Sequence, residues 1–482
     1  MARDLCPPPV REEGIRLKQA ETSISEGVAE LRRSLDGDVV VPGDVQYDAA
    51  RLCFNAFVDR RPAVIVRCLG RADVATAFDF ARANELEVAV RGGGHNPAGH
   101  CVLDGGLVID LTRMRRVHVD RDARVARAEG GSTWLDFDTA TVAHGLVAPG
   151  GVVGSTGVCG LALGGGIGHL TSQHGLTSDN IVGADLVSPD GNLVRASDDE
   201  NPELLWALRG GGGNFGVAIH LEFRLHPVQT VIGGKLTYRG PVGNVLRAFR
   251  DIVAEAPSDA SCQAVLVLDG SLEPTVVVFP CVTGATDDHP LLDGLRAIPG
   301  LVEDGVRRHS FIAQQSMFGT GYGDARHYWK GHFVRELPDE LIDELVLRIS
   351  ALGRSPGDIL FESLHGAPKS ADAPPGAIGW RQAAFNVSAT ATWRDPALDD
   401  QHVEWSRETA SAIEPWSWSG GGYANYMQAD EPIERVRAMF AEGAFDRLQA
   451  LKQRYDPDNV LRRNQNIPPG RSQRGGRGAA VA

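Results

Sequence analysis

The stretch RGGGHNPAGH, residues 91–100, places a histidine directly after three glycines. Glycine loses more backbone freedom on folding than any other residue, so a glycine triplet indicates that something approaches this backbone closely. Two further glycine clusters follow, GSTGVCGLALGGGIG at 154–168 and RGGGGNFGVA at 209–218. Successive backbone N–H groups without side chains form an anion-binding surface, and a diphosphate needs several such donors. The three clusters together predict a large cofactor that carries phosphate.

Short strands and helices lead into the first cluster. AVIVRCL at 63–69 and EVAV at 87–90 are typical of strands, and the segment between them, 71–85, has the apolar period of a helix. The glycine turn begins where the second strand ends, which is where open α/β sheets bind ligands. The turn lacks the spacing of G-x-G-x-x-G, so a Rossmann dinucleotide site is disfavoured. Further strands are predicted at 107–111, 124–130 and 217–228, and a helix at 133–145.

The pattern changes after about residue 230. Alternating strands at 264–270, 274–282 and 384–393 are separated by amphipathic segments such as 336–353, which predicts a second α+β domain built on an antiparallel sheet. One helix is predicted over 431–455. The last residues, 469–482, lack apolar periodicity and are predicted to form a disordered tail.

The composition excludes several classes of protein. A chain of 482 residues is too long for one ordinary core, so two or three packed units are expected. The net charge of −14 argues against a nucleic-acid partner, because nucleic-acid binders concentrate Lys and Arg. No apolar run is long enough to span a bilayer, and the opening MARDLCPPPV lacks the apolar region of a secretory signal. We therefore expect a cytoplasmic protein without a membrane partner.

Metal and hydrolase chemistry have little support in the sequence. The seven cysteines are scattered, with no Cys-x-x-Cys pair, and are interpreted as reduced thiols. No metal site is expected, because no metal-binding pattern joins the histidines His100, His118, His144, His169 and His174. A Gly-x-Ser-x-Gly elbow is also lacking, which weighs against a hydrolase.

The glycine clusters and their flanking motifs resemble the bacterial branch of the berberine bridge enzyme-like flavoproteins, in the vanillyl-alcohol oxidase/PCMH superfamily. The resemblance covers about residues 30 to 468 and rests on PGDVQYDAAR (42–51), RRPAVIV (60–66), RGGGHNPAG (91–99), the GGGIG loop with HGLTSDN (174–180), LLWALRGGGGNFGV (204–217) and YDPDNVLRRNQNI (455–467). It implies an α+β, two-domain PCMH-type FAD-binding fold, in which an inserted substrate domain is built on an antiparallel sheet covered by helices. The implied limits are 30–229 for the FAD-binding domain, 230–420 for the substrate-binding domain, and 421–468 for the return to the FAD domain and active site.

The resemblance also implies a covalent flavin, held by an 8α-histidyl bond to His95. Neutral imidazole is a competent nucleophile; the alternative is that His95 only makes a hydrogen bond within a turn. Many relatives carry a second, cysteinyl bond, but its position falls at Val153, whereas Cys159 falls where relatives carry a small residue. We therefore expect a single bond through His95, with Cys159 as a loop-packing residue and a second attachment as the alternative. The residues expected to contact FAD are Arg91, Gly92, Gly93, Gly94, His95, Asn96, Gly99, Val153, Gly154, Ser155, Thr156, Gly157, Cys159, Gly160, Gly164, Gly165, Gly168, Asn214, Gly216, Val217, Asn464 and Asn466.

Candidate catalytic residues lie near the C-terminus. The stretch GGYANYMQ (421–428) resembles the family's Tyr-x-Asn-Tyr segment beside the active site, which puts forward Tyr423 and Tyr426 as catalytic residues and Asn425 as an orienting one. A phenol base needs a pKa lowered from its usual value of about 10. The alternative is that both tyrosines pack at the domain junction. The asparagines of the terminal motif, at 464 and 466, either contact the flavin region or cap the final turn.

One further segment carries several polar side chains with strand alternation. HYWKGHF, at 327–333, places His327 and Phe333 on one face and Tyr328, Lys330 and His332 on the other. We expect these to be solvated sheet residues, with pocket lining by one face as the alternative.

The function that the resemblance implies is that of an FAD-dependent oxidase. It would move a hydride from an alcohol, sugar or amine C–H bond to the flavin, while a protein base takes a proton from the adjacent hydroxyl or amine, and then reduce O2 to hydrogen peroxide. An oxygen-insensitive flavin dehydrogenase is one alternative. A flavin-binding carrier or resistance protein without turnover is the other, and the presence of both tyrosines argues against it.

Overall fold

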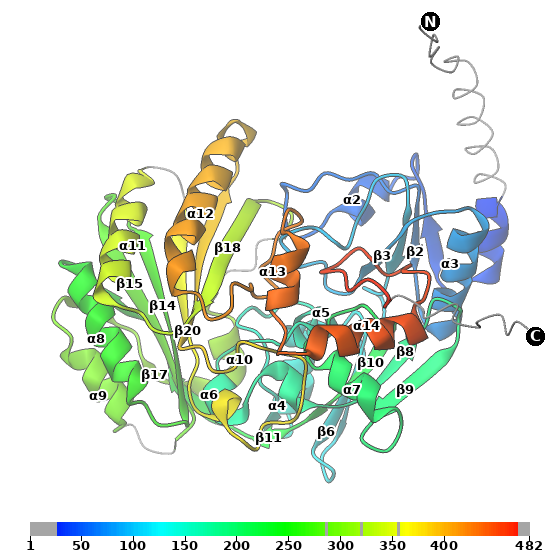
Figure 1. Cartoon of the computed structure of the whole chain (residues 1–482). Coiled ribbons are helices and arrows are strands. Elements are labelled where there is room, and N and C mark those ends of the chain that lie inside the picture. Colours follow the sequence, from blue (N-terminus) through cyan, green and yellow to red (C-terminus); the bar gives the residue numbers. More distant parts are fainter. Residues whose placement is uncertain (1–26, 285–287, 319–321, 354–356, 471–482) are drawn as a thin grey trace, which may run out of the picture.

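A computed structural model describes residues 27–284, 288–318, 322–353 and 357–470 of the chain (Figure 1). The first sheet has the strand order β1-β2-β4-β3. Its strands are β1 (Asp38–Val40), β2 (Val64–Arg67), β3 (Val88–Arg91) and β4 (Leu107–Asp110), and the short helix α2 spans Tyr47–Arg51. Both β2 and β3 pair in parallel with β4, and helix α3 (Arg71–Ala83) connects β2 to β3. Because Val74, Ala77 and Phe78 of α3 are buried, the predicted β-α-β unit that ends at Arg91 is confirmed.

The second sheet is antiparallel, in the order β5-β6-β10-β8-β9. Its strands are β5 (Val117–Asp120), β6 (Val125–Glu129), β8 (Ile181–Val187), β9 (Leu193–Ser197) and β10 (Val217–Arg224). The helices and short strands around it are α4 (Trp134–Val142), β7 (Leu146–Val147), α5 (Val158–Leu163), α6 (Thr171–His174), the 3-10 turn Thr177–Asn180, α7 (Pro202–Leu208) and β11 (His226–Pro227). Helix α4 begins at a capping box, in which Thr133 and Asp136 satisfy each other's backbone N–H groups.

The third sheet is a nine-stranded antiparallel sheet, with a main path β16-β13-β15-β14-β19-β20-β18. Its strands are β12 (Thr230–Gly233), β13 (Leu236–Tyr238), β14 (Ala260–Leu268), β15 (Pro274–Val282), β16 (Leu301–Asp304), β17 (Arg307–Ser310), β18 (Arg326–Val334), β19 (Gly357–Ser363) and β20 (Phe385–Trp393). Helices α8 (Val242–Ala254), α9 (Pro290–Ala297), α11 (Asp339–Ala351) and α12 (Asp399–Ile413) cover its outer face, on the left in Figure 1. The predicted antiparallel sheet covered by helices is confirmed, while the exact domain limits stay a prediction.

Side chains of the third sheet alternate between a helix-covered core and the inner face. Leu266 of β14, Val278 of β15 and Phe361 of β19 are buried in one cluster with Phe249 and Leu345 of the helices. The residues between them in sequence point to the opposite face, toward the first two sheets, because successive side chains on a strand alternate. Short segments complete this part: α10 (Phe311–Gln315) and three 3-10 turns at Ala367–Lys369, Pro396–Leu398 and Glu414–Trp416. Within the described ranges, no helix is long and apolar enough to cross a membrane.

The chain returns to the first half through two helices, α13 (Ile433–Ala438) and α14 (Ala444–Tyr455), so the prediction of one helix over 431–455 is wrong. Between them, Phe440 forms an antiparallel bridge with Ile378, and Gly443 adopts a φ of 72°. Backbone pairing with the segment at 377–379 outweighs the helical pattern of the sequence here. The tail predicted at 469–482 lies, from residue 471 on, outside the described residues.

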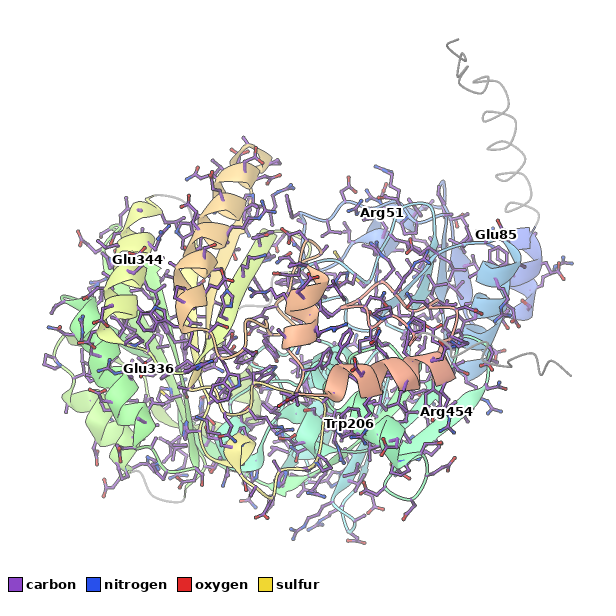
Figure 2. The ribbon with its side chains drawn as sticks, viewed as in Figure 1. Arg51, Glu85, Trp206, Glu336, Glu344 and Arg454 are labelled. Carbon is purple, nitrogen blue, oxygen red and sulfur yellow. The ribbon has the colours of Figure 1, made fainter. Side chains whose placement is uncertain are left out.

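A buried ion pair fixes this C-terminal return. Lys452 Nζ donates to Asp456 Oδ2 at 2.6 Å, to Asn214 O at 2.9 Å and to Leu461 O at 2.9 Å, and neither charged side chain is exposed to solvent (0% each). Helix α14 also packs against α7, where the Arg447 guanidinium lies 3.6 Å from the centre of the Trp206 ring, labelled in Figure 2. The Lys452 ammonium therefore joins the third glycine cluster to the last residues of the fold.

Replacement of Lys452 by methionine should lower the free energy of unfolding by about 3 to 5 kcal/mol, because it leaves the Asp456 carboxylate buried without a cation. Urea unfolding monitored by circular dichroism measures the change. The matched control is Arg462→Met, which removes an exposed pair with Glu87 (53% and 35% exposed) and should change the same free energy by about 1 kcal/mol or less. Equal effects of the two substitutions would contradict the assignment of Lys452 as a structural anchor.

Candidate functional site

A cavity of about 770 Å³ lies between the glycine clusters of the first half and the inner face of the third sheet. The sheet wall consists of Gln263, Val265, Val277, Phe279, His327, Trp329, Asp358, Leu360, Thr390 and Thr392. Tyr423, Asn425 and Tyr426 from the C-terminal return line the cavity as well. Its volume is in the range of ligand pockets, about 300 to 1,000 Å³.

Most residues predicted to contact FAD line this cavity. They are Gly92, Gly93, Gly94, His95, Asn96, Val153, Thr156, Gly157, Cys159, Gly160, Gly164, Asn214, Gly216, Val217 and Asn464. The others, which do not line it, are Arg91, Gly99, Gly154, Ser155, Gly165, Gly168 and Asn466. Among these, Arg91 is buried beside Asp110 at 3.6 Å, and Ser155 contacts His95. The three glycine clusters, which are far apart in sequence, therefore meet at one cavity.

Two glycines allow the first two clusters to touch. A Cβ atom on Gly93 would lie 2.4 Å from Gly157 N, and a Cβ atom on Gly157 would lie 2.5 Å from Gly93 N. No side chain fits at either position, so the close approach expected of the glycine triplet is an approach of backbone to backbone. Gly160 and Gly213, in contrast, have no heavy atom within 4 Å of a Cβ position, which leaves bare backbone at the cavity.

His95 lies on the wall of the cavity as a neutral imidazole. Burial, with a smaller contribution from His327, lowers the pKa of His95 to about 4. Its ring stacks on Phe54, with centroids 4.1 Å apart, and its Nε2 lies 2.8 Å from Ser155 Oγ. Within the described residues, Nδ1 has no hydrogen-bond partner. Phe54 and Ser155 thus fix the ring of His95, while its Nδ1 atom is free to contact a ligand.

Cys159 and Val153 also line the cavity, and the environment of the thiol is apolar. Cys159 lies in α5 and is 5% exposed, and burial raises its pKa to about 12. A thiol with such a pKa holds its proton at neutral pH, and the thiolate is the nucleophilic form. This arrangement favours the interpretation of Cys159 as a packing residue.

The two tyrosines occupy different environments. Tyr423 Oη accepts hydrogen bonds from Ile167 N and Asn425 Nδ2, both at 3.0 Å. Tyr426 Oη donates to Glu362 Oε1 at 3.2 Å, and the two phenol rings are 4.7 Å apart at 70°. Burial raises the pKa of both phenols above the usual value, and the Glu362 carboxyl raises it further, which is opposite to the direction that a phenolate base needs.

Glu362 is a candidate functional residue that the sequence reasoning missed. Its side chain is buried, and it accepts hydrogen bonds from Tyr426 Oη and from Asn386 Nδ2 at 2.7 Å. Burial raises the pKa of Glu362 to about 7, a value suited to proton transfer at neutral pH. Asp358, on the same face of β19, lines the cavity and was missed too. The available signal was the alternation of GDILFES, which puts two acidic side chains on one face of a strand.

The prediction of solvated side chains at 327–333 is wrong for both faces of β18. On the inner face, His327 stacks on Phe54 with centroids 4.3 Å apart, and Trp329 meets the Tyr426 ring at 5.3 Å. On the outer face, Lys330 Nζ pairs with Glu431 Oε1 at 2.8 Å, and His332 is 1% exposed. The reason is that α12 covers one face of β18 and the cavity lies on the other.

The residues around the cavity fit a flavin dinucleotide. Bare backbone at the glycine clusters suits a diphosphate, and the Arg463 side chain lines the same region as a cation. Arg463 Nε and Asn464 Oδ1, on two residues that line the cavity, are buried without a hydrogen-bond partner in the described structure. Since buried polar groups are normally hydrogen-bonded, these atoms indicate a polar ligand. The described ranges hold no group of three His, Cys, Asp or Glu side chains that could bind a metal.

Two family models match the chain. The model of an FAD binding domain matches residues 62–197, and the model described as berberine and berberine like matches residues 422–468. The first contains the glycine triplet, His95 and the second glycine cluster. The second contains both tyrosines and the terminal asparagines.

Individual relatives cover nearly the whole chain. The (R)-6-hydroxynicotine oxidase of Paenarthrobacter nicotinovorans is 32% identical over 451 residues, which span 90% of this chain and 97% of that protein. The crystal structure of 6-hydroxy-D-nicotine oxidase from Arthrobacter nicotinovorans matches with a TM-score of 0.83 at 31% identity, over 91% of this chain and 99% of that one. The xylooligosaccharide oxidase of Myceliophthora thermophila shares the fold, with a TM-score of 0.79 at 22% identity over 93% and 99% of the two chains. The chain belongs to the berberine bridge enzyme-like family of FAD-linked oxidoreductases.

Proposed function

We propose that this oxidoreductase holds FAD through one covalent bond to His95, oxidises a C–H bond of an alcohol, sugar or amine, and passes the electrons to O2. When bound, FAD supplies the acceptor for the hydride and the route to O2. The observation that carries the proposal is that His95 and Tyr426 line one cavity, with Glu362 hydrogen-bonded to Tyr426 behind it. Similarity to a relative named as an oxidase supports O2 as the acceptor.

The state of His95 supports its assignment as the attachment residue. Its lowered pKa keeps the ring neutral, so a nitrogen lone pair is present at physiological pH. If Nε2 carries the proton and donates it to Ser155 Oγ, the lone pair resides on Nδ1, which has no partner in the described structure. Ser155 then acts as a positioning residue that selects the tautomer.

We assign proton transfer to Tyr426 and Glu362 acting together. Tyr426 lines the cavity, whereas Glu362 lies behind it, so the phenol is the group that meets the substrate. As the hydride leaves the substrate, Tyr426 Oη receives the proton of the substrate hydroxyl or amine and gives its own proton to Glu362 Oε1. This route needs no free phenolate, which agrees with the raised phenol pKa.

The two tyrosines should respond differently to removal of the hydroxyl. Tyr426→Phe breaks the proton route and should lower the rate of flavin reduction by about a hundredfold or more. Tyr423→Phe instead leaves the buried Ile167 N–H without its acceptor, which should cost about 1 to 3 kcal/mol of stability with a smaller effect on that rate. Stopped-flow absorbance and thermal unfolding measure the two quantities. A loss of rate in Tyr423→Phe that matches the loss in Tyr426→Phe would contradict this division.

Anaerobic mixing of the purified holoenzyme with a panel of alcohols, sugars and amines tests the proposed function. Bleaching of the flavin followed by peroxide release on admission of O2 is the expected result. Bleaching that is reversed by a dye but not by O2 would instead establish a dehydrogenase. If no compound in a broad panel bleaches the flavin, the catalytic proposal fails, and the result favours a flavin-binding carrier without turnover.

A further inference from the structure

The inner face of the third sheet carries two acidic groups without matching cations, and one of them lines the cavity. Asp358 lines the cavity, and Glu362 lies four residues further along the same face of β19. No Lys, Arg or His of the described ranges pairs with either carboxyl group, whose partners are Thr390 Oγ1 for Asp358, and Asn386 and Tyr426 for Glu362. Two charged side chains next to this wall, Asp324 and Arg394, also line the cavity; they are 54% and 75% exposed and pair with each other at 3.0 Å.

Asp358 is also not needed to hold the sheet together. Thr390 faces it across the β19–β20 ladder and donates one hydrogen bond, so the remaining acceptor sites of the carboxylate are open to the cavity. Burial raises the pKa of Asp358 to about 6, so at neutral pH the group is largely ionised yet poorly solvated. An unpaired carboxylate in such a position is costly, and a ligand cation would offset that cost.

The rest of the wall suits an apolar cation better than a sugar. Val265, Val277, Phe279, Leu360 and Trp329 make most of this surface apolar or aromatic. Trp329 lies directly across β20 from Asp358, since Thr390 pairs with both, and aromatic faces attract cations. The Gln263 side chain, 4% exposed, lines the cavity with its Oε1 atom unpartnered, and it lies opposite Glu362, away from the Asp358 end of the wall.

We propose that Asp358 binds an ammonium group of the substrate, so that the enzyme acts on cationic amines with an apolar body. The proposal rests on the function proposed above and names its substrate class. On β19, Asp358 and Glu362 are about 13 Å apart between Cα atoms, at about 3.3 Å per residue. The ammonium group is therefore separate from the C–H bond that is oxidised beside Tyr426. Asp358 acts as the specificity-determining residue, and Trp329, in register with it across β20, completes its site.

The test is binding of two probes with one skeleton, measured by isothermal titration of the holoenzyme at neutral pH. The probes are a tertiary-alkyl amine that carries a phenylethyl arm and the corresponding tertiary alcohol. Neither has a hydrogen on the carbon that bears the heteroatom, so that carbon cannot be oxidised and binding is read without turnover. We expect the wild type to bind the ammonium probe about ten- to a hundredfold more tightly than the alcohol, because a charge-assisted hydrogen bond contributes a difference of this size.

The variants decide whether Asp358 causes this preference. Asp358→Asn keeps an acceptor for Thr390 and should bind both probes with similar affinity. The control Asp324→Asn removes a carboxylate of the same cavity that already has its own cation, and should retain the preference. Equal binding of the two probes to the wild type, no measurable binding of the ammonium probe, or a preference that survives Asp358→Asn would overturn the proposal. The titration measures binding and not turnover. Its outcomes can therefore be interpreted even if the flavin-bleaching experiment fails.

Discussion

Acid precipitation of the His95→Ala variant is expected to leave the flavin in the supernatant, whereas the pellet of the wild type stays yellow. A covalent bond survives denaturation of the protein, while flavin held by backbone hydrogen bonds and packing is released. His95 directly follows the glycine triplet, and its neutral imidazole presents an unpartnered nitrogen at the cavity, so its removal should abolish attachment almost completely. Absorbance of the pellet and supernatant measures the result.

Two further variants make this experiment specific. Cys159→Ala should keep the flavin in the pellet, because burial holds its thiol protonated. Ser155→Ala should attach flavin more slowly, because the ring of His95 loses the hydroxyl that fixes Nε2. The flavin content of each variant is measured before precipitation, which separates loss of attachment from loss of binding. Retention of the flavin in His95→Ala, or its release from Cys159→Ala alone, would contradict attachment through His95.

The second large effect is expected for Glu362→Gln. The amide keeps the size of the side chain, but it replaces one acceptor oxygen by a donor NH2 group and cannot accept a proton. The rate of flavin reduction by a compound that bleaches the wild type should therefore fall by about a hundred- to ten-thousandfold. Stopped-flow absorbance under anaerobic conditions measures this rate. A variant that reduces its flavin at the rate of the wild type would remove Glu362 from the proton route.

The rate of flavin reduction should depend on pH in a way that a purely structural role of Glu362 would not produce. Burial raises the pKa of Glu362 to about 7, and only the ionised carboxylate accepts a proton. In the wild type the rate should therefore rise as the pH increases through about 7. In Glu362→Gln this rise should be absent, and a profile unchanged from that of the wild type would show that another group titrates.

Stability should change in the opposite direction to activity. In the unfolded chain Glu362 titrates at about 4.3, so the folded state binds this proton more tightly, and its contribution to stability falls as the pH rises from about 4 to about 7. Glu362→Gln removes this dependence and should melt at a higher temperature than the wild type above neutral pH. Low activity together with higher stability would exclude unfolding as the cause of the lost rate.

The cofactor side of the cavity could be predicted from the sequence because its signals are local. A glycine cluster predicts that another group approaches its backbone closely, and His95 lies directly beside one of these clusters. The strands and helix that precede it, over residues 64–91, have apolar periods that burial in the structure reproduces. The family resemblance then named the cofactor that these loops fit.

The substrate side could not be predicted in the same way because it depends on pairing across the third sheet. Asp358 and Glu362 belong to a short strand whose charges suggest an exposed edge, yet β19 is buried between β14 and β20. Likewise, Lys330 and His332 gain partners at 431 and 435, about a hundred residues away, which no local pattern reveals. The break between α13 and α14 has the same origin, since the segment at 377–379 competes for the backbone of a sequence that would otherwise stay helical.

The anchor formed by Lys452 has a consequence for biosynthesis. Asn214 lies in the third glycine cluster, and its backbone carbonyl accepts a hydrogen bond from Lys452 Nζ. Its side-chain Oδ1 accepts a second one from Ile467 N at 3.1 Å, across 253 positions of the chain. A nascent chain whose residues 452–467 have not yet emerged from the ribosome therefore lacks one wall of the cavity. We expect flavin loading to follow emergence of this segment, so that the proposed bond to His95 would form long after residue 95 itself has left the ribosome.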